Sequence, residues 1–519
     1  MSLSIVTGAP GVRTQWMDTS GPSLDIGRTD VAGILGVAER GPFNVAVKVL
    51  SQRQFETVFG GPLAGAVLAC AVQGFFANGG RCCWVVRVGP EEQARRAACA
   101  VELPGGARLL LQASSAGEWG NDILIEPVWG RDGIVAITAT EGERSQQIEL
   151  PLPEARSAVS RSLSGLPLGA LPELGAGELI GASVAMRESW SGPVIAWDRQ
   201  PLYLSGGSGA QGAVTAQHFT GNPAPAPRPR WGMDVLDRID GISFVAAPDL
   251  ACLDLDAATL RAAQLTLMAR CIERRDRIAI LDVPQLPRDQ APAYRDGFPD
   301  NGFGALYYPW ICVDDALAPN GSLRTIPPSG HVAGLYARTD RVRGVHKPPT
   351  NEVLEGVWGP SEVIDVAGHG ALNDAHINAI RALPGRGILV LGARTVAQDP
   401  RWWFVNVRRL FSMIEAAIDA RMQWLVFEPN NPSLWRDIDR AVRGLLQDLY
   451  AAGMLDGATA AEAYSVQCDE HTNPASVIDE GRVVCDIGLQ PPYPAEFLVV
   501  RIGVTRSGIQ VEDQGARDG

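Results

Sequence analysis

Residues 399–435 decide the fold of this chain, and their sequence is DPRWWFVNVRRLFSMIEAAIDARMQWLVFEPNNPSLW. Over residues 400–421 apolar side chains recur every three or four positions, which predicts an α-helix with one apolar face. Asp399 is expected to cap this helix, and the proline that follows suits its first position. A strand over residues 422–427, a Pro-Asn-Asn-Pro break and a second amphipathic helix capped by Ser433 are expected to follow.

Towards the N-terminus the chain alternates between strands and helices. From Asp240 onward, continuous apolar strands alternate with helices, which predicts a covered and largely parallel sheet. Residues 29–90 have the same organisation, with a short helix that begins after Ser51 and ends at two glycines. Residues 91–221 instead carry frequent Gly and Pro between strand-like stretches. They predict a mostly β inserted module, joined by the proline-rich connector 223–230.

Length and composition indicate a globular protein of roughly three domains, since the chain has 519 residues and 46% of them are hydrophobic. A net charge of −13 argues against a nucleic-acid partner. The sequence contains no apolar run long enough to cross a membrane and no export leader, so membrane insertion is not expected. The nine cysteines include no CxxC pair and lie in apolar contexts, which predicts buried free thiols.

Two sequence features resemble catalytic or nucleotide-binding motifs, and a structural role is the better explanation for each. Residues 207–212, GSGAQG, fit the dinucleotide pattern, but the required helix and acidic residue do not follow, so a glycine loop is expected. Asp249 and Asp282 stand at strand ends, where α/β enzymes often hold carboxylates. A proline precedes Asp249 and another follows Asp282 two residues later, which favours a turn or cap role.

A serine hydrolase site and a metal site are also disfavoured. Ser329 and His331 lie in PPSGH, which lacks the GxSxG elbow, so Ser329 is expected to be a helix N-cap. The six histidines have no metal-binding spacing, and the chain has no GxxxxGK[ST] loop. The expected cofactor content is therefore none.

Arginines are concentrated between residues 381 and 411, where six stand against one acid. Two interpretations stay open. The arginines form a basic patch for an acidic partner surface, or their acidic partners lie elsewhere in the folded chain.

Several long motifs resemble contractile tail sheath proteins, the sheath subunits of contractile phage tails, R-type pyocins and phage-like extracellular injection systems. In the C-terminal part these are PGRGILVLGART (384–395), DPRWWFVNVRRLF (399–411), QWLVFEPNNPSLW (423–435) and CDIGLQPPYPAEFLVVRIG (485–503). Earlier in the chain VAGILGVAERGP (31–42) and PPSGHVAGLYARTDRVRGVHKPPTNEVLEGV (327–357) resemble the same family. Its usual opening is matched only in part, by residues 9–12.

The resemblance implies an α/β and α+β multidomain sheath fold. The expected division is an extended N-terminal arm (1–25), a discontinuous α/β core (26–90 with 232–365), the inserted mostly β outer module (91–231), a C-terminal tube-facing domain (366–505) and a polar tail (506–519). The terminal arms are expected to donate strands to neighbouring subunits.

The same resemblance implies a structural, non-enzymatic subunit that polymerises as a helical sheath around an inner tube and contracts to drive the tube through a target envelope. Three groups of residues are the expected sites: Arg401, Arg408 and Arg409 for tube contact; Ala9, Gly11, Val12, Phe497, Val499 and Arg501 for strands exchanged between subunits; and Arg338, Arg341, Arg343 and Lys347 for ion pairs between subunits. A solvated basic face is the equal alternative for the last group.

The expected partners are further copies of the chain, an inner tube protein, and baseplate and terminal cap proteins, with a sheath paralogue left open. Assembly is expected in the cytoplasm, as part of a phage tail or of a phage-like particle that can be released. Two alternatives remain: a baseplate or cap protein with the sheath fold that does not polymerise, and an α/β enzyme.

Overall fold

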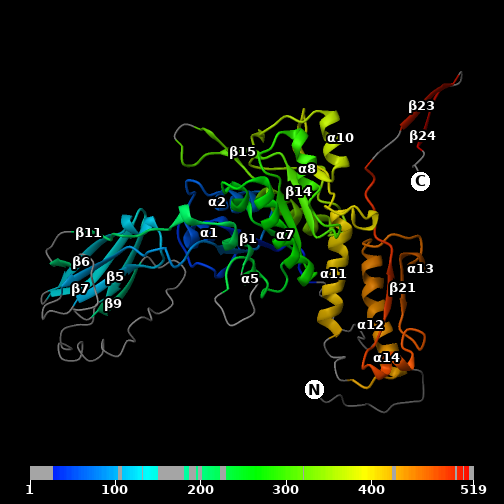
Figure 1. Ribbon diagram of the computed structural model, residues 1–519, viewed down its shortest axis with the longest axis horizontal. Helices are drawn as coiled ribbons and strands as arrows, with labels where there is room; N and C mark the ends of the chain where they lie inside the picture. The colour runs from blue at the N-terminus through cyan, green and yellow to red at the C-terminus, as the bar shows by residue number, and fades with distance from the viewer. Residues whose placement is uncertain are drawn as a thin grey trace, which may run out of the picture.

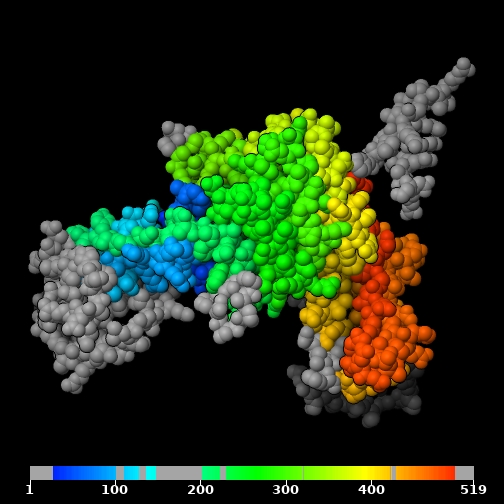
Figure 2. All heavy atoms as spheres, in the orientation of Figure 1, coloured from blue at the N-terminus to red at the C-terminus, as the bar shows by residue number. Residues whose placement is uncertain are grey.

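The computed structural model describes residues 27–102, 108–130, 133–149, 180–185, 194–196, 201–221, 230–318, 321–422, 428–496, 500–505 and 508–513. Three bodies follow one another along the long axis of the molecule: a β module, a central α/β body and a C-terminal helical body (Figure 1). In the space-filling view the β module projects from one side of the central body and the C-terminal body from the other (Figure 2). The expected multidomain α/β and α+β fold is confirmed.

The central body is built on a nine-stranded sheet of order β17-β20-β19-β14-β13-β12-β1-β3-β2. Six neighbouring strands are parallel: β3 (Cys83–Arg87), β1 (Ala32–Gly36), β12 (Phe244–Ala246), β13 (Ile278–Asp282), β14 (Gly304–Tyr308) and β19 (Ile377–Leu383). Antiparallel strands complete both edges: β2 (Ala46–Val49), β20 (Gly387–Leu391) and β17 (Glu352–Val353). The predicted covered and largely parallel sheet is therefore confirmed.

Successive side chains of a strand point to opposite faces of the sheet, so alternate residues of each central strand pack in different cores. On β13, Ile278 and Ile280 pack with α1 (Gln52–Phe59), α2 (Leu68–Ala77) and α9 (Ser329–Arg343). Ala279 and Leu281 pack towards the other face, which is covered by α4 (Ala216–Thr220), α5 (Met233–Leu236), α7 (Ala257–Arg274), α8 (Ala291–Arg295) and α10 (Val366–Asp374). Both faces are buried, which explains the continuous apolar strands.

Shorter elements complete the central body. A three-stranded antiparallel sheet holds β16 (Leu323–Ile326), β15 (Ile311–Asp314) and β18 (Gly359–Pro360). The helical turns α6 (Pro248–Cys252) and η5 (Arg288–Gln290) lie in connections. Ser51 caps α1 as predicted, since its hydroxyl accepts from the amide of Gln54 at 3.2 Å.

The β module consists of two four-stranded sheets. One has the order β10-β4-β5-β9 and the other β11-β6-β7-β8. The bounds are β4 (Ala98–Glu102), β5 (Arg108–Ala113), η1 (Glu118–Asp122), β6 (Leu124–Gly130), β7 (Gly133–Glu141), β8 (Arg144–Glu149), β9 (Ile180–Ala185), β10 (Val194–Ala196) and β11 (Leu202–Tyr203). The module has a separate apolar core.

The segments that leave for the β module and come back from it lie close together at Asn44. The amide of Asn44 donates to the carbonyl of Arg87 (2.9 Å), where the chain departs, and its side-chain oxygen accepts from the amide of Gly232 (3.4 Å), which follows the returning helix α4. Arg40 pairs with Glu141 across the boundary at 2.8 Å. The glycine motif 207–212 lies on this return path. It leads into η4 (Gln211–Ala213) and the five-residue α4, so a glycine loop is observed rather than a nucleotide site.

The C-terminal body contains η6 (Pro400–Trp402), α11 (Val405–Met422), α12 (Pro432–Ala451), α13 (Ala460–Ala463), β21 (Tyr464–Gln467), α14 (Ala475–Asp479) and β22 (Asp486–Leu489). The apolar faces predicted for α11 and α12 pack together in one core. Strands β21 and β22 form a two-stranded antiparallel sheet.

Three local predictions for residues 399–435 need correction. Asp399 caps the 3-10 turn η6 by accepting from the amide of Arg401 (3.0 Å), and the α-helix begins only at Val405. Asn431, not Ser433, caps α12, because its side chain accepts from the amides of Ser433 and Leu434. Of the strand expected over residues 422–427, Met422 ends α11 instead and 423–427 lie outside the described residues.

Within the expected polar tail 506–519, β24 (Gly508–Asp513) forms a hairpin with β23 (Val500–Thr505). Within the described residues this hairpin is a sheet of its own. The expected arm 1–25 lies outside those residues. No described helix is long and apolar enough to span a membrane.

Candidate functional site

Helix α11 belongs to two cores at once. Val405, in its first turn, packs in the central body with α9 and the sheet. One turn later Leu410, and then Ile414, pack in the C-terminal body with α12. Figure 1 shows α11 as a single rod that leaves the central body and runs along the C-terminal body. Because one continuous helix is buried in both, the helix fixes how the two bodies are placed.

Arg409 anchors α11 to the central body through a buried ion pair. Its guanidinium donates to Asp340 of α9 with two parallel hydrogen bonds, Nη1 to Oδ1 at 2.8 Å and Nη2 to Oδ2 at 2.5 Å. The guanidinium also lies against the rings of Tyr336 and Phe244, 5.0 and 5.2 Å from their centroids. Only 3% of the Arg409 side chain and 1% of the Asp340 side chain are exposed.

Burial dominates the electrostatics of this pair. Desolvation raises the pKa of Asp340, and the facing Arg409 guanidinium and its hydrogen bonds act against that rise. A buried carboxylate of this kind depends on its partner, because an unpaired charge cannot be solvated there. The pair therefore fixes how α11 packs against α9, and its net contribution to the free energy of unfolding is small.

Segments near both ends of the described chain contact the first two turns of α11. Arg409 Nη2 also donates to the carbonyl of Thr29 at 2.9 Å, which is the third described residue. Asn406, completely buried, donates to the carbonyls of His346 (2.8 Å) and Pro492 (3.0 Å). Pro492 stands shortly before the terminal hairpin. The first two turns of α11 thus hold the segments that lead to both ends of the chain.

A second arginine fixes the C-terminal segment. Arg394 pairs with Glu496 through two hydrogen bonds, one of them from Nε to Oε1 at 2.9 Å. The guanidinium of Arg394 lies 5.3 Å from the ring centroid of Trp403. Beside it, Phe404 meets Tyr493 edge to face with ring centroids 6.2 Å apart. The residues that tie these segments to α11 are called the α11 junction below: Thr29, Asp340, Arg394, Asn406, Arg409, Pro492 and Glu496.

The structure separates the three arginines expected to contact a tube. Arg409 is enclosed in the α11 junction. Arg408 is buried between Trp402 and Phe303, with its guanidinium 4.3 and 4.5 Å from their centroids, and pairs with Glu415 at 3.2 Å. Neither side chain offers a surface, so tube contact is corrected to an internal role for Arg408 and Arg409. Arg401 does lie at the surface, with 79% of its side chain exposed.

The arginine concentration between residues 381 and 411 is largely neutralised within the chain. Arg394, Arg401, Arg408 and Arg409 pair with Glu496, Asp399, Glu415 and Asp340, respectively. Arg394, Arg408 and Arg409 therefore follow the interpretation in which the acidic partners lie elsewhere in the folded chain, whereas Arg401 pairs with Asp399 inside the stretch.

The basic residues on and after α9 differ among themselves. Lys347 pairs with Glu352 at 3.1 Å, and Arg338 lies 4.0 Å from the same carboxylate, so both have a partner within the chain. Arg341 is exposed and donates to the carbonyl of Gly79 at 2.6 Å. Arg343 is exposed at the end of α9. Arg341 and Arg343 are therefore the members of this group that face outward.

Both strand-end carboxylates cap helices, as the cap prediction requires. Asp249 accepts from the amides of Val37 (2.8 Å) and Val67, at the start of α2. Asp282 accepts from the amide (2.9 Å) and the hydroxyl (2.6 Å) of Ser329, at the start of α9. The N-cap prediction for Ser329 is therefore wrong, because Asp282 supplies the capping oxygen. Burial raises the pKa of Asp249 to about 6 and that of Asp282 to about 7.

His331 completes no catalytic set with these groups. Its ring packs against Gly74, where an added Cβ would approach within 2.2 Å, and its Nδ1 makes no hydrogen bond. Burial lowers the pKa of His331 to about 4. The described residues include no cluster of three metal-ligating side chains. The arrangement supports helix capping and packing rather than acid–base chemistry.

Only one of the residues expected to exchange strands belongs to the described part of the chain. Ala9, Gly11, Val12, Phe497 and Val499 lie outside the described residues. Arg501 lies in β23, opposite Glu512 of β24. The carbonyls and amides of the outer edges of this hairpin have no strand partner within the described residues.

Asp340, Asn406, Arg394 and Glu496 were missed by sequence reasoning. One weak signal existed for Asp340, which is the single acid among Arg338, Arg341 and Arg343 on α9. Asn406 interrupts the apolar start of α11 and is polar at a buried position, which also points to a specific partner.

Two family models match adjoining parts of the chain. The model described as "Phage tail sheath protein central domain" matches residues 231–396, and "Phage tail sheath C-terminal domain" matches residues 397–505. Together they cover just over half of the chain, and their boundary falls immediately before η6 and α11.

Individual proteins agree with these matches. A putative prophage major tail sheath protein of Pseudomonas aeruginosa (strain UCBPP-PA14) is 31% identical over 285 residues, which are 53% of this chain and 69% of that protein. The tail sheath protein of Vibrio phage KVP40 is 30% identical over 194 residues, 36% of this chain and 27% of that longer protein. The contracted helical sheath of the anti-feeding prophage superposes with a TM-score of 0.58 at 20% identity, covering 96% of this chain and 100% of that chain. At that identity the likeness concerns the fold.

Proposed function

The chain belongs to the phage tail sheath family, and we propose that many copies of it form a helical sheath around an inner tube, which contracts to drive the tube through a target envelope. The observation that carries the proposal is the α11 junction. It holds the segments that lead to both chain ends on the helix that joins the central and C-terminal bodies. A subunit built in this way can pass a displacement of its neighbours to the body that lies nearest the tube.

Strand exchange is the proposed link between copies. An extended segment that joins the sheet of another chain gains main-chain hydrogen bonds, and these survive rigid rotation of the subunits about flexible connections. The hairpin β23–β24 offers free strand edges within the described residues. Ala9, Gly11, Val12, Phe497, Val499 and Arg501 remain the residues proposed for this exchange.

Tube contact is now proposed for Arg401 alone. Its side chain is exposed beside the start of α11, whereas Arg408 and Arg409 are internal. Arg401 shares its charge with Asp399 at 2.6 Å, and an exposed pair of this kind contributes little to stability, so it is free to rearrange on contact. Arg341 and Arg343 are proposed for ion pairs between subunits. Arg338 and Lys347 instead pair with Glu352 within the chain.

Further aspects of the proposal rest on the family alone. The partners are copies of the same chain, an inner tube protein, and baseplate and cap proteins. The division into arm, core, outer module, tube-facing domain and C-terminal segment follows the expected boundaries, with the last segment now partly a hairpin. The particle is assembled in the cytoplasm, and the chain catalyses no reaction. Energy for contraction comes from a metastable lattice.

Negative-stain electron microscopy of the purified full chain tests this function. We expect tubes of uniform width, because sheath subunits can assemble without the tube in the contracted arrangement. A small defined oligomer at every concentration and salt condition would instead support a baseplate or cap protein of the same fold. Expression together with the tube and baseplate proteins should yield the longer, extended form.

A further inference from the structure

Cys468 and Cys485 face each other at the end of the β21–β22 ladder. In this antiparallel pair Val466 lies opposite Ile487 and Gln467 opposite Asp486, so the next opposed pair is Cys468 and Cys485. Side chains two residues apart on a strand share a face, and Val466 and Cys468 are both buried in the C-terminal core. Cys485 and Ile487 pack against that same core. Each thiol shifts the pKa of the other, as expected for two side chains in close proximity.

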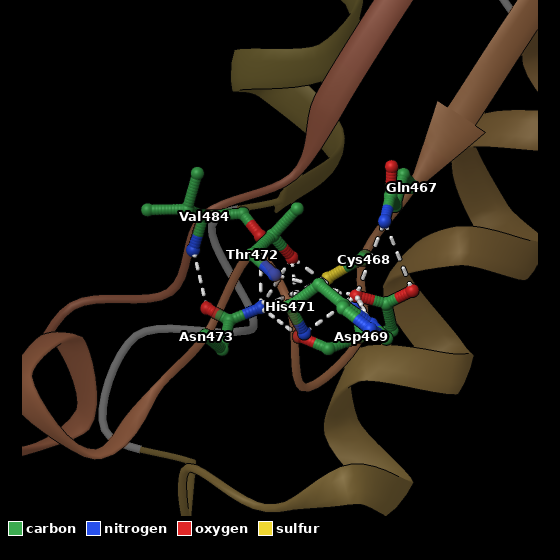
Figure 3. Close-up of polar contacts among 7 residues, drawn as sticks. All are labelled: Gln467, Cys468, Asp469, His471, Thr472, Asn473 and Val484. Atoms are coloured by element: carbon green, nitrogen blue, oxygen red, sulfur yellow. Dashed lines mark hydrogen bonds and ion pairs between the residues drawn. The ribbon is translucent and has the colours of Figure 1, made fainter.

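Asn473 holds the two strands together at this point. Its side-chain oxygen accepts from the amide of Val484 (2.7 Å), and its side-chain nitrogen donates to the carbonyl of Val484 (2.9 Å) and to that of Asp469 (3.1 Å). The same nitrogen lies 3.9 Å from the sulfur of Cys468. Figure 3 shows this carboxamide between the two chain segments, with Cys468 beside it. The residue before Cys485 is thus fixed to the residue after Cys468.

A disulfide requires two Cα atoms about 4.4–6.8 Å apart with Cβ atoms directed at each other. Directly opposed residues of an antiparallel ladder have Cα atoms about 4.5–5.5 Å apart. The last ladder pair, Gln467 and Asp486, therefore directs Cys468 and Cys485, one residue further on, toward this range, and the Asn473 side chain holds the two segments together. Both cysteines are free thiols.

We propose that Cys468 and Cys485 are an oxidisable pair that forms an intrachain disulfide when the protein meets a disulfide oxidant such as glutathione disulfide. The thiolate of Cys485, the more exposed of the two, attacks one sulfur of the oxidant and releases one glutathione. The thiolate of Cys468 then attacks the Cys485 sulfur and releases the second glutathione. Two thiols are oxidised, one disulfide is reduced, and the two protons pass to the released glutathione thiolates or to solvent.

The surroundings of the pair make this reaction slow at neutral pH. Burial is the main cause that raises the pKa of both thiols, that of Cys485 to about 12, and Asp439 also acts in this direction on both. Since the thiolate is the attacking form, the rate should rise with pH. A slowly oxidised pair stays reduced during assembly in a reducing compartment. It closes only after prolonged exposure to oxidant, when it would fix the loop between β21 and β22.

Peptide mapping provides a direct test, because trypsin places the two cysteines on different peptides. Cleavage after Arg443, Arg482 and Arg501 yields residues 444–482, which contain Cys468, and residues 483–501, which contain Cys485. The purified full chain is incubated with glutathione disulfide at mildly alkaline pH, alkylated under denaturing conditions and digested without reductant. We expect both peptides to be replaced by one linked species, two hydrogens lighter than their sum, and to return after reduction.

Three variants serve as controls. Cys468→Ser and Cys485→Ser should each abolish the linked species. Cys312→Ser should leave it unchanged, since Cys312 is also partly buried but contacts Thr325. Persistence of the two separate peptides in the wild-type chain, each alkylated or carrying one glutathione, would overturn the proposal. Linkage of either cysteine to any other, within or between chains, would overturn it as well. The wild-type result decides the test, so a variant that fails to fold does not change the conclusion.

Discussion

Arg409 of α11 and Asp340 of α9 form a bidentate ion pair with oxygen–nitrogen distances of 2.8 and 2.5 Å, although 69 residues separate them in sequence. The pair is enclosed by Tyr336 and Phe244 and also reaches the carbonyl of Thr29. It therefore joins the central body, the C-terminal body and the first described residues at a single guanidinium.

The Arg409→Met variant should lose about 3–5 kcal/mol in the free energy of unfolding, because Asp340 is left buried without its partner. The double variant Arg409→Met with Asp340→Leu should recover most of that loss, since neither charge remains buried. Urea denaturation followed by tryptophan fluorescence measures both. Arg401→Met, at an exposed pair, is the control and should change the free energy of unfolding by less than about 1 kcal/mol. Equal effects of Arg409→Met and Arg401→Met would contradict this account.

The Arg401→Glu variant should reduce the yield of extended sheath on its tube while leaving tube-free sheath intact. Arg440→Glu is a matched control, because Arg440 has the same 79% side-chain exposure and also pairs with a nearby aspartate, Asp437. Electron microscopy of particles expressed with the tube and baseplate proteins counts the two forms. Normal numbers of extended particles from Arg401→Glu would remove Arg401 from the proposed tube contact.

The pH dependence of stability should change in the Asp282→Asn variant. In the folded chain the pKa of Asp282 is raised to about 7, whereas an unfolded aspartate has a pKa near its usual value of about 3.9. Between these values the folded state alone holds the proton, so the contribution of this group to stability falls as pH rises. Removing it should flatten the decline in melting temperature between pH 5 and 8.

A variant of His331 should change the same profile in the opposite sense. The pKa of His331 is lowered to about 4 on folding, so the unfolded state alone binds its proton between that value and about 6.5. Its contribution to stability is therefore lost as pH falls through this window. In His331→Gln the melting temperature should fall less between pH 6.5 and 4.5 than in the wild-type chain. An unchanged profile in both variants would show that neither group titrates as described.

Glu496→Gln should loosen the segment that leads to the terminal hairpin, because Arg394 loses its charged partner. A hydrogen bond to a charged group contributes about 1.5–3 kcal/mol, so trypsin should cleave after Arg501 at least several times faster. Timed proteolysis with mass spectrometry measures the rate. Glu480→Gln is the control, since its pair with Arg482 is largely exposed. A cleavage rate after Arg501 that stays at the wild-type value would mean that Glu496 does not hold this segment.

Deletion of residues 1–20 should abolish polymerisation and leave a folded, soluble subunit, because the proposed exchanged strand is removed while the described body is retained. Sedimentation and electron microscopy measure assembly, and circular dichroism checks the fold. Sheaths of normal length from this truncation would exclude residues 9–12 from the link between subunits.

The repeating apolar patterns in the sequence predicted individual helices and strands well. The stripe around Leu410 and Ile414 was sufficient to identify α11, because helix packing depends on local spacing. Continuous apolar strands such as residues 278–282 were sufficient to predict a covered parallel sheet. Long motifs within one family supplied the multidomain arrangement.

Such patterns do not predict which residues far apart in sequence become hydrogen-bond or ion-pair partners in the fold. Asp282 caps α9 from a strand 47 residues away, whereas local patterning favours the adjacent Ser329 as the cap. Local charge does not reveal burial, so the sequence predicts tube contact for Arg408 and Arg409, whose partners come from another turn of the same helix and from another helix. Asn431 and Ser433 are both good caps, and only the backbone conformation decides between them.

The closeness of the departing and returning segments, both bonded by Asn44, has a consequence for how such proteins diversify. Because the chain leaves at Arg87 and is held beside that point again at Gly232, a different insert could occupy the same place without altering the register of the nine-stranded sheet. The module inserted at this position can therefore be exchanged during evolution, and foreign domains can be displayed there by design. A replacement would need to supply a carboxylate for Arg40 and a carbonyl for Arg87, which the present insert provides through Glu141 and Ala116.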